Sequence, residues 1–264
     1  MVSYIAGVQD KFYNGEVDRN LKKIRSIVSK TKELQPEAEL ILFPELAATG
    51  YFLSEELYDV AENQGGRIEG EMSQLATEFG VILAYGYVEQ GEDDKIYNSL
   101  KVINEAGKTI GNYRKIHLTP LEKGYFTPGN EVVLIESSMG KLGLMICWDL
   151  AFPELARELA CKGAHVVLAP SAWELPYNKP YNRFGMARAI DNTLFLVTVN
   201  HVGKSGELEF FGESGIYGPD GERIAGADND EQIIFARLDQ EIRKEWRKDF
   251  FSMLDERRVD VYKI

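Results

Sequence analysis

Leu142-Gly-Leu-Met-Ile-Cys147-Trp-Asp-Leu-Ala-Phe-Pro153-Glu154 is the stretch of sequence that decides the fold class. Its first part is an apolar run of strand length, and Pro153 opens a helical pattern that ends at Gly163. Proline suits the first turn of a helix, and glycine suits the position just past its end. A strand that leads into a helix places the connecting residues at the carboxyl end of a sheet, where α/β proteins hold their sites. We therefore expect an α/β protein with Cys147 at such an edge.

The same two patterns continue on both sides of this stretch. Short apolar runs predict strands, apolar residues at helical spacing predict helices, and turns at 104–107 and 218–221 predict hairpins. No linker or repeat divides the chain, so we expect one domain over residues 1–264 with a charged, aromatic C-terminal arm at about 247–264. The predicted strands are Tyr4–Val8, Leu40–Phe43, Val81–Val88, Ser99–Ile103, Glu131–Ile135, Lys141–Cys147, His165–Ala169, Leu194–Val199 and Gln232–Leu238, and the predicted helices are Val17–Leu34, Glu69–Phe79, Pro153–Gly163 and Asn182–Asp191.

Composition excludes several classes of function. The 264 residues carry 42 acidic and 30 basic side chains, for a net charge of −12, which disfavours a nucleic-acid partner. Two cysteines and three histidines lack the spacing of a metal site, so we expect no metal. No signal segment opens the sequence, and no apolar run approaches the roughly 20 residues of a membrane helix. We therefore expect a cytoplasmic protein that does not contact membranes.

Cys147 and Cys161 have different surroundings in the sequence. Cys147 lies at the predicted strand end and is a candidate nucleophile, although a buried structural thiol fits that position as well. Cys161 lies in the predicted helix and is expected to be core. A nucleophilic cysteine needs a base and a stabiliser for the oxyanion. A Cys/His pair with His117, His165 or His201 stays open, but no local signature supports it.

Glu45 and Lys115 are further candidates for catalysis. Glu45 follows a buried-looking strand and Pro44, where loss of solvent raises the pKa of a carboxyl group toward the range of a general base. Lys115 ends an extended run, where a cation can stabilise a thiolate or an oxyanion. Taken alone, Glu45 is more simply interpreted as a loop or helix-capping carboxylate, and Lys115 as a solvent-exposed lysine.

Together these residues lie in three blocks with a family resemblance. Phe43–Tyr51, Tyr113–Leu118 and Met145–Glu154 resemble, in order, the three signature blocks of the nitrilase superfamily of carbon–nitrogen hydrolases. Three further segments resemble other parts of that family, with Asp191 in place of its commoner Glu: Leu121–Gly129, Gly163–Ser171 and Arg188–Asn192. The resemblance covers essentially the whole chain. It implies a four-layer α-β-β-α sandwich with two mixed sheets, and a homodimer or a larger homo-oligomer.

The resemblance also implies a site and a mechanism. Glu45, Lys115 and Cys147 would form the catalytic triad, with Glu122 as a fourth member. Cys147 would attack the carbonyl carbon of a small-molecule amide, and the Lys115 ammonium with the backbone N–H of Trp148 would hold the oxyanion. Glu45 would move the protons, and a thioester at Cys147 would be hydrolysed to the acid. This chemistry needs no metal and no organic cofactor.

The expected substrate class follows from the neighbours of Cys147. Nitrile-cleaving relatives tend to carry Cys-Trp-Glu, whereas this chain has Cys-Trp-Asp, as amidase-type branches do. Leu150–Phe152 stands where branches that bind a substrate carboxylate tend to carry arginine. The predicted substrate-binding residues are Trp148, Trp173, Glu174 and Tyr51, although Glu174 facing water is an equal alternative. A neutral or cationic amide, including a carbamoyl amine, is therefore expected.

Other activities stay open at this point. An ω-amidase or a nitrilase would use the same residues, and Arg183 or Arg188 could supply a clamp for a substrate carboxylate. An acyltransferase would pass the thioester to an amine or a lipid instead of water. A catalytically silent regulatory module is disfavoured, because such a module has no reason to keep all four catalytic residue types.

Overall fold

Two six-stranded mixed sheets form the centre of the structure, a computed structural model that describes residues 2–248 and 250–262. In each sheet three neighbouring strands run parallel, and antiparallel strands complete the edges. The first sheet has the order β14 (Gln232–Asp239), β1 (Val2–Gln9), β2 (Ala38–Leu42), β3 (Ile82–Gln90), β4 (Ile96–Ile103) and β5 (Thr109–Arg114). The second has the order β13 (Arg223–Gly226), β12 (Gly215–Tyr217), β9 (Phe195–Val199), β8 (Val166–Pro170), β7 (Gly140–Leu144) and β6 (Leu134–Ser137).

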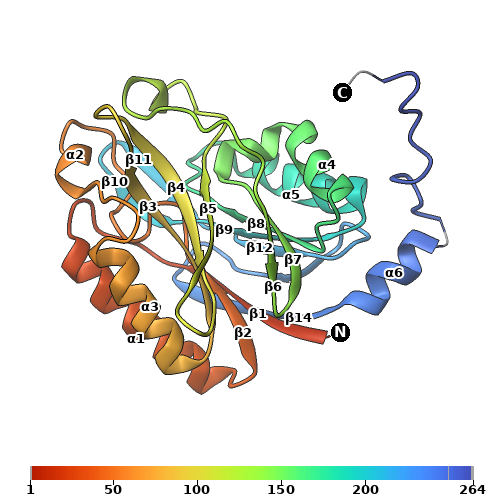
Figure 1. Cartoon of the computed structure of the whole chain (residues 1–264), viewed down its shortest axis with the longest axis horizontal. Coiled ribbons are helices and arrows are strands. Elements are labelled where there is room, and N and C mark those ends of the chain that lie inside the picture. The colour runs from red at the N-terminus through yellow and green to blue at the C-terminus, as the bar shows by residue number, and fades with distance from the viewer. Residues whose placement is uncertain (1, 249, 263–264) are drawn as a thin grey trace.

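Helices cover the outer face of each sheet. α1 (Val17–Leu34) and α3 (Arg67–Phe79) lie on one side of the paired sheets, and α4 (Pro153–Cys161) and α5 (Asn178–Asn192) lie on the other (Figure 1). α1 turns Leu21, Ile24 and Val28 toward the first sheet, and all three are buried. This spacing of three and four residues puts them on one helical face. The predicted four-layer α-β-β-α sandwich is confirmed.

The strands at the centre are buried on both faces. In β2, Leu40 and Leu42 belong to the core between the sheets, whereas Ile41 packs with the residues under α1 and α3. Successive side chains of a strand point to opposite faces. A strand covered on both faces is therefore apolar throughout. Full burial of each Leu or Ile side chain stabilises the fold by about 1.5–3 kcal/mol.

The remaining elements lie in the connections. They are the helices α2 (Leu57–Val60) and α6 (Gln240–Lys248), the 3-10 helices η1 (Glu122–Gly124) and η2 (Cys147–Ala151), and a hairpin of β10 (Val202–Ser205) and β11 (Leu208–Phe211). The predicted hairpins at 104–107 and 218–221 are confirmed, since they join β4 to β5 and β12 to β13. None of the helices in the described part of the chain is long and apolar enough to cross a membrane.

Some boundaries predicted from the sequence are wrong. The strand expected at 131–135 is β6 at Leu134–Ser137, and the strand before Cys147 already ends at Leu144. The strands β10 and β11 escaped prediction, because runs of four residues with a charged member show no apolar pattern. The strands β5, β12 and β13 correspond to arms of the two predicted hairpins.

The prediction for Cys161 is also wrong, because its side chain is exposed. Leu155, Ala156 and Leu159 form the buried stripe of α4, and Cys161 lies at the last residue of the helix, off that stripe.

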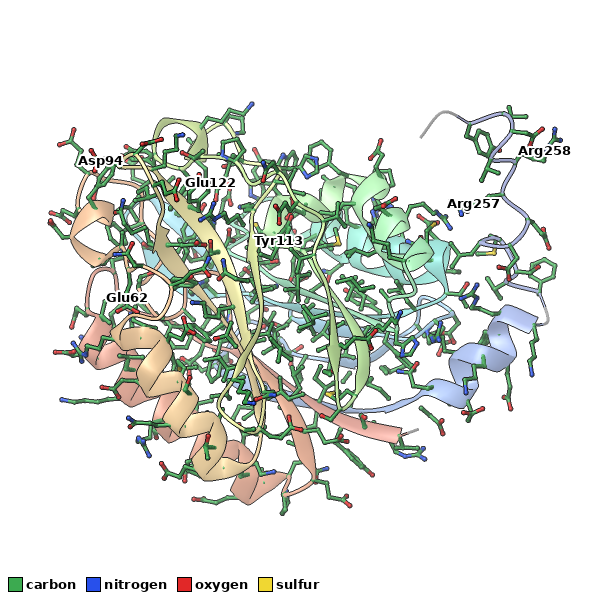
Figure 2. The ribbon with its side chains drawn as sticks, viewed as in Figure 1. Glu62, Asp94, Tyr113, Glu122, Arg257 and Arg258 are labelled. Atoms are coloured by element: carbon green, nitrogen blue, oxygen red, sulfur yellow. The ribbon has the colours of Figure 1, made fainter. Side chains whose placement is uncertain are left out.

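The C-terminal segment leaves the body of the molecule after α6. It projects beyond α4 and α5 in Figure 1, and Figure 2 shows Arg257 and Arg258 on it, far from Glu122 and Tyr113. The segment is only partly packed, since Leu254 joins the core but Phe250 is 82% exposed.

Candidate active site

Glu45, Lys115, Glu122 and Cys147 converge at one edge of the two sheets. Glu45 follows β2, Lys115 follows β5, Glu122 starts η1 and Cys147 starts η2. β2 and β5 end at the same edge of the first sheet, because two antiparallel steps separate β5 from β3, which is parallel to β2. All four side chains are buried, and even Cys147 is only 2% exposed. The fold thus collects four chemically reactive groups in a dry interior.

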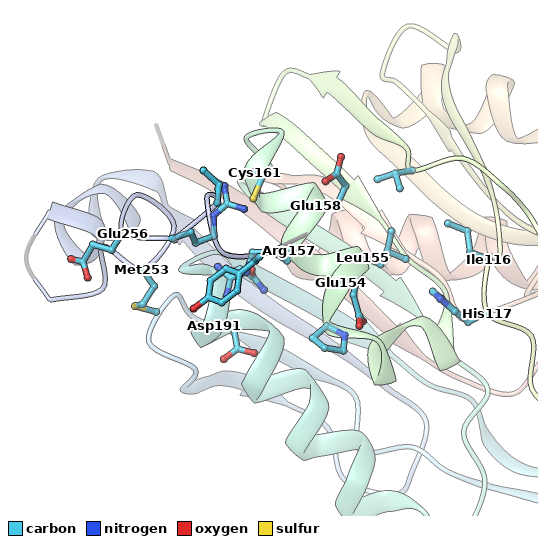
Figure 3. A pocket seen from close by; sticks show the side chains of 16 residues that line it. Ile116, His117, Glu154, Leu155, Arg157, Glu158, Cys161, Asp191, Met253 and Glu256 are labelled. Atoms are coloured by element: carbon cyan, nitrogen blue, oxygen red, sulfur yellow. The ribbon is translucent and has the colours of Figure 1, made fainter. Parts of the chain in front are cut away.

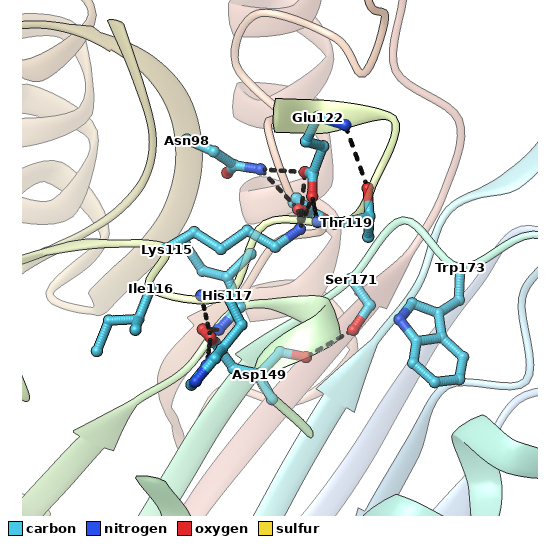
Figure 4. A network of polar contacts seen from close by, with 12 residues as sticks. Asn98, Lys115, Ile116, His117, Thr119, Glu122, Asp149, Ser171 and Trp173 are labelled. Atoms are coloured by element: carbon cyan, nitrogen blue, oxygen red, sulfur yellow. Dashed lines mark hydrogen bonds and ion pairs between the residues drawn. The ribbon is translucent and has the colours of Figure 1, made fainter. Parts of the chain in front are cut away.

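Lys115 is the centre of this cluster (Figure 4). Its Nζ lies 2.7 Å from Oε1 of Glu45 and 2.7 and 2.8 Å from the two carboxylate oxygens of Glu122. The backbone N–H of Lys115 donates to the carbonyl of Asn98, and its own carbonyl accepts from Gly129. Both main-chain groups are therefore fixed, and the ammonium is held between two carboxylates.

Asn98 belongs to the site, although the sequence reasoning missed it. Its Nδ2 donates to Oε1 of Glu45 at 2.7 Å and to Oε1 of Glu122 at 3.1 Å. Asn98 lies in β4, a strand whose side chains are almost all buried. An asparagine within such a strand is the signal that could have identified it, because a buried amide needs polar partners.

The turn that carries Glu45 depends on two distant residues. Gly86 in β3 lies so close that a Cβ there would come within 2.1 Å of the backbone nitrogen of Leu46. Leu46 itself has a φ of 53°, in the left-handed region. Nε2 of His201 donates to the carbonyl of Glu45 at 2.6 Å. Burial lowers the pKa of His201 to about 4, so its ring is neutral and donates from this nitrogen.

Cys147 is the first residue of η2 and lies in a strained turn that follows β7. Its φ is 50°, a conformation that is uncommon for residues other than glycine and is often found at functional sites. Trp148 is the second residue of η2, where the helix itself does not use the backbone N–H. The geometry leaves that N–H as a donor next to the thiol.

The electrostatics of the cluster fix its resting charges. Burial raises the pKa of the Cys147 thiol well above its usual value, and Glu45 adds repulsion. Burial also opposes charge on Lys115 and Glu122, but their mutual attraction outweighs it, so the pKa of Lys115 is raised and that of Glu122 is lowered. Cys147 is therefore a neutral thiol beside an ionised Lys115–Glu122 pair.

Glu45 differs from Glu122 in both charge and contacts. Burial raises its pKa to about 7, with Glu122 contributing repulsion, while Lys115 and Asn98 act in the opposite direction. Its Oε1 accepts from Lys115 and Asn98, whereas its buried Oε2 has no hydrogen-bond partner within residues 2–248 and 250–262. Glu45 thus has a free acceptor atom and a pKa near neutrality.

Aromatic side chains and one carboxylate lie next to the cluster. The rings of Trp148 and Trp173 are 5.8 Å apart, and Tyr51 packs edge to face on Phe210. Glu174 is partly buried, and burial raises its pKa, with Glu122 near enough to raise it further. These residues surround the cluster with apolar walls and one additional acid.

Arg183 and Arg188, the two candidates for binding a substrate carboxylate, make other contacts or face solvent. Nε of Arg188 donates to the carbonyl of Leu150, and its Nη1 pairs with Asp191. Arg183 is exposed on α5. Among the described residues, no three His, Cys, Asp or Glu side chains are arranged to hold a metal ion.

Comparison with known proteins identifies the family. Residues 4–248 match the model of the family described as carbon–nitrogen hydrolase. The chain belongs to the carbon–nitrogen hydrolases. It is 39% identical over 252 residues to the "Probable nitrilase C965.09" of Schizosaccharomyces pombe, covering 94% of this chain and 93% of the relative. The resemblance seen in the three sequence blocks is confirmed.

Solved structures of this family are also similar. The carbon–nitrogen hydrolase from Helicobacter pylori G27 superposes with a TM-score of 0.93 at 30% identity, covering 99% of this chain and 97% of that one. An amidase from Nesterenkonia sp. AN1, in which acrylamide has added to the active-site cysteine, superposes with a TM-score of 0.86 at 25% identity, covering 98% of both chains.

Replacement of Gly86 by alanine should displace the Glu45 turn, because the added Cβ would collide with the backbone at Leu46. We expect Gly86→Ala to lower turnover of an amide by about a hundredfold, the effect of moving a reacting group by about 1 Å. Gly70→Ala is the matched control, since this helical glycine has open space around it and alanine favours helices. Unchanged turnover in folded Gly86→Ala, measured beside thermal unfolding, would contradict the expectation.

Proposed function

We propose that this carbon–nitrogen hydrolase cleaves the carbon–nitrogen bond of a small amide through a thioester on Cys147. The observation that carries the proposal is the unpaired Oε2 of Glu45, buried close enough to Cys147 to raise the pKa of its thiol. A proton acceptor beside a neutral thiol is what a nucleophile of this kind requires. The active-site cysteine of the Nesterenkonia amidase supports the same assignment.

In the first half of the reaction, Cys147 becomes acylated. Oε2 of Glu45 takes the thiol proton as Sγ attacks the carbonyl carbon, and the carbonyl oxygen becomes an oxyanion. The Lys115 ammonium and the N–H of Trp148 stabilise this oxyanion, a role that is typically worth about 3–4 kcal/mol for each donor. Glu45 then gives the proton to the leaving nitrogen, the carbon–nitrogen bond breaks, and ammonia or an amine departs.

In the second half, water releases the acid. Glu45, again ionised, takes a proton from a water molecule, whose oxygen attacks the thioester carbon. The carbon–sulfur bond breaks, and Glu45 returns the proton to Sγ of Cys147. One carboxylate thus serves as base, acid and base again, which favours a pKa close to neutrality. Glu122 keeps Lys115 charged and in place during both halves.

The substrate class follows from the charges around the site. The names of relatives do not decide it, since they include a 2-oxoglutaramate amidase of Bacillus subtilis and an N-carbamoylputrescine amidase of Solanum lycopersicum. In this chain Glu174 adds an acid to the cluster, while Arg188 is bound to Leu150 and Asp191. We infer that neutral or cationic amides, including carbamoyl amines, bind in preference to substrates with a free carboxylate.

The C-terminal arm supports an assembly of at least two copies. A cavity of about 830 Å³ separates it from α4 and the end of α5 (Figure 3). Phe250 and Val259 on the arm are 82% and 70% exposed. Apolar side chains exposed on a projecting segment are better covered by another subunit. We infer a homodimer or a larger homo-oligomer in which a second copy covers this face.

The roles of the two cysteines can be separated by substitution. We expect Cys147→Ala to abolish release of ammonia or amine from amides, because it removes the nucleophile. Cys161→Ala is the matched control and should retain most of the activity, since Cys161 is exposed at the end of α4. A panel of short amides, ω-amides, carbamoyl amines and nitriles would identify the substrate for this assay. Turnover by Cys147→Ala would contradict the mechanism.

The pH dependence of kcat/KM should reflect the ionisation of Glu45. The free enzyme needs Glu45 ionised, and its pKa is about 7, so kcat/KM should fall tenfold per pH unit below that value and level off above it. The measurement uses a neutral amide between pH 5 and 9, so that the substrate does not titrate. An acid limb centred near 4.5, the ordinary pKa of glutamate, would show that Glu45 is not the titrating base.

The charge of the substrate should affect kcat/KM, and Glu174 should account for part of this effect. For amides of equal length that end in an ammonium, a methyl or a carboxylate group, we expect kcat/KM to be about a hundredfold lower for the carboxylate, which corresponds to a few kcal/mol of repulsion. Glu174→Gln should reduce the difference in kcat/KM between the carboxylate and the other two amides. Glu207→Gln, at the exposed tip of the β10–β11 hairpin, should leave that difference unchanged. A preference for the carboxylate that is lost in Arg183→Ala or Arg188→Ala would overturn the inference.

Light scattering tests the assembly. We expect a mass of at least twice the 29.8 kDa of the chain. Phe250→Asp should lower the mass, because it places a charge on the exposed arm, and Leu34→Asp, at an exposed position on the distant α1, is the control. A wild-type mass of one chain would refute the inference.

A further inference from the structure

The carboxylate of Asp149 takes no part in the proposed reaction, yet it makes several hydrogen bonds. Its side chain is fully buried, and no lysine or arginine is paired with it among the described residues. Oδ2 accepts from the Tyr113 hydroxyl at 2.7 Å and from the Ile146 N–H at 2.8 Å. Oδ1 accepts from the backbone N–H of His117 at 3.0 Å and from its Nδ1 at 2.8 Å. Four donors therefore occupy the four acceptor positions of one carboxylate.

These donors come from the two segments that carry the reactive groups. Tyr113 and His117 lie two residues before and two residues after Lys115, and Ile146 immediately precedes Cys147. Figure 4 shows Asp149 with His117 below the Lys115 and Glu122 pair. One side chain thus joins a segment of the first sheet to a turn of the second.

The contact at Ile146 also bears on the strained turn. The N–H of Asp149 donates to the Ile146 carbonyl, and the Asp149 side chain accepts from the Ile146 N–H, so the residue closes the turn in both directions. Cys147, with its left-handed φ, lies inside that closed turn. A strained conformation persists only where its surroundings hold it.

We propose that Asp149 is a positioning residue that holds the Cys147 turn and the Lys115 segment in register for acyl transfer. The inference rests on the proposed function. Asp149 does not touch the substrate or the reacting atoms; it sets the distance between the nucleophile and the ammonium that stabilises the oxyanion. Loss of this register should lower kcat more than it changes KM, because Trp173, Tyr51 and Glu174 lie on other segments of the chain.

The first test is Asp149→Asn, which keeps the shape but replaces one acceptor oxygen by an NH₂ group that faces N–H and O–H donors. We expect kcat to fall about a hundredfold with KM within threefold of wild type. Asp94→Asn, at an exposed position in the β3–β4 connection, is the control and should match wild type. A folded Asp149→Asn protein with wild-type kcat would overturn the proposal.

His117 offers a second test that does not require change of the buried carboxylate. Its ring stacks on Phe152, with centroids 3.7 Å apart. His117→Phe keeps the stacking and loses the Nδ1 hydrogen bond, whereas His117→Asn loses the stacking and keeps a donor near Nδ1. We expect a large loss of kcat only in His117→Phe, and an intermediate loss in Tyr113→Phe. Equal kcat in the two His117 variants would overturn the proposal, even if Asp149→Asn does not fold.

The rate at which Cys147 is alkylated can be measured without turnover, so it tests the role of Asp149 separately from the proposed function. In a Cys161→Ala background, Cys147 is the single remaining cysteine, and iodoacetamide reports its accessibility. Release of the turn should speed alkylation of Cys147 about tenfold in Asp149→Asn and in His117→Phe, and leave it unchanged in Asp94→Asn. An unchanged rate would count against Asp149 as the clamp. Absence of amide hydrolysis by the wild type would instead count against the proposed function.

Discussion

The structure depends on one lysine that is charged and fully buried. Lys115 has lost its water, and such a loss costs several kcal/mol for each ion unless close partners replace the solvent. Glu45 and Glu122 are those partners, at 2.7 Å each, and Asn98 completes the hydrogen bonding of the carboxylates. Removal of one partner from a buried ion pair typically destabilises a protein by about 3–5 kcal/mol. The loops that carry these residues are therefore held together by the cluster as well as by the apolar core.

The architecture explains why the cluster can form at this place. In each sheet the central strands are parallel, so their carboxyl ends lie at the same edge, and the connections that follow them meet there. The two sheets pack through a shared core, which brings the turn after β7 to the turn after β2. Close approach then needs special residues. Gly86 leaves space for the Glu45 turn, and neutral His201 holds its carbonyl.

Burial divides the acids of the site into distinct roles. Glu122 lies on Lys115 through both oxygens and stays ionised, whereas Glu45 shares Lys115 with Asn98 and keeps one oxygen free. The same dry environment that raises the pKa of Glu45 to about 7 also keeps Cys147 protonated at rest. In the proposed reaction, proton transfer between these two groups leaves the net charge of the cluster unchanged. Asp149 stands apart as a carboxylate whose two oxygens accept four hydrogen bonds from the segments around Lys115 and Cys147 and which fixes their geometry.

The sequence by itself determined the fold class through its apolar periodicity, and the resemblance of its short motifs to a known family implied the four layers and the four clustered residues, because periodicity and short motifs are local properties. It also indicated the hairpins at 104–107 and 218–221. Only the tertiary structure decided which distant residues meet. Lys115 and Glu45 are 70 positions apart, and His201 and Glu45 are 156 apart, so their contact depends on strand order and sheet packing. The contacts of Asn98, Gly86, Asp149 and Arg188 follow from that packing, which no single segment of the chain encodes.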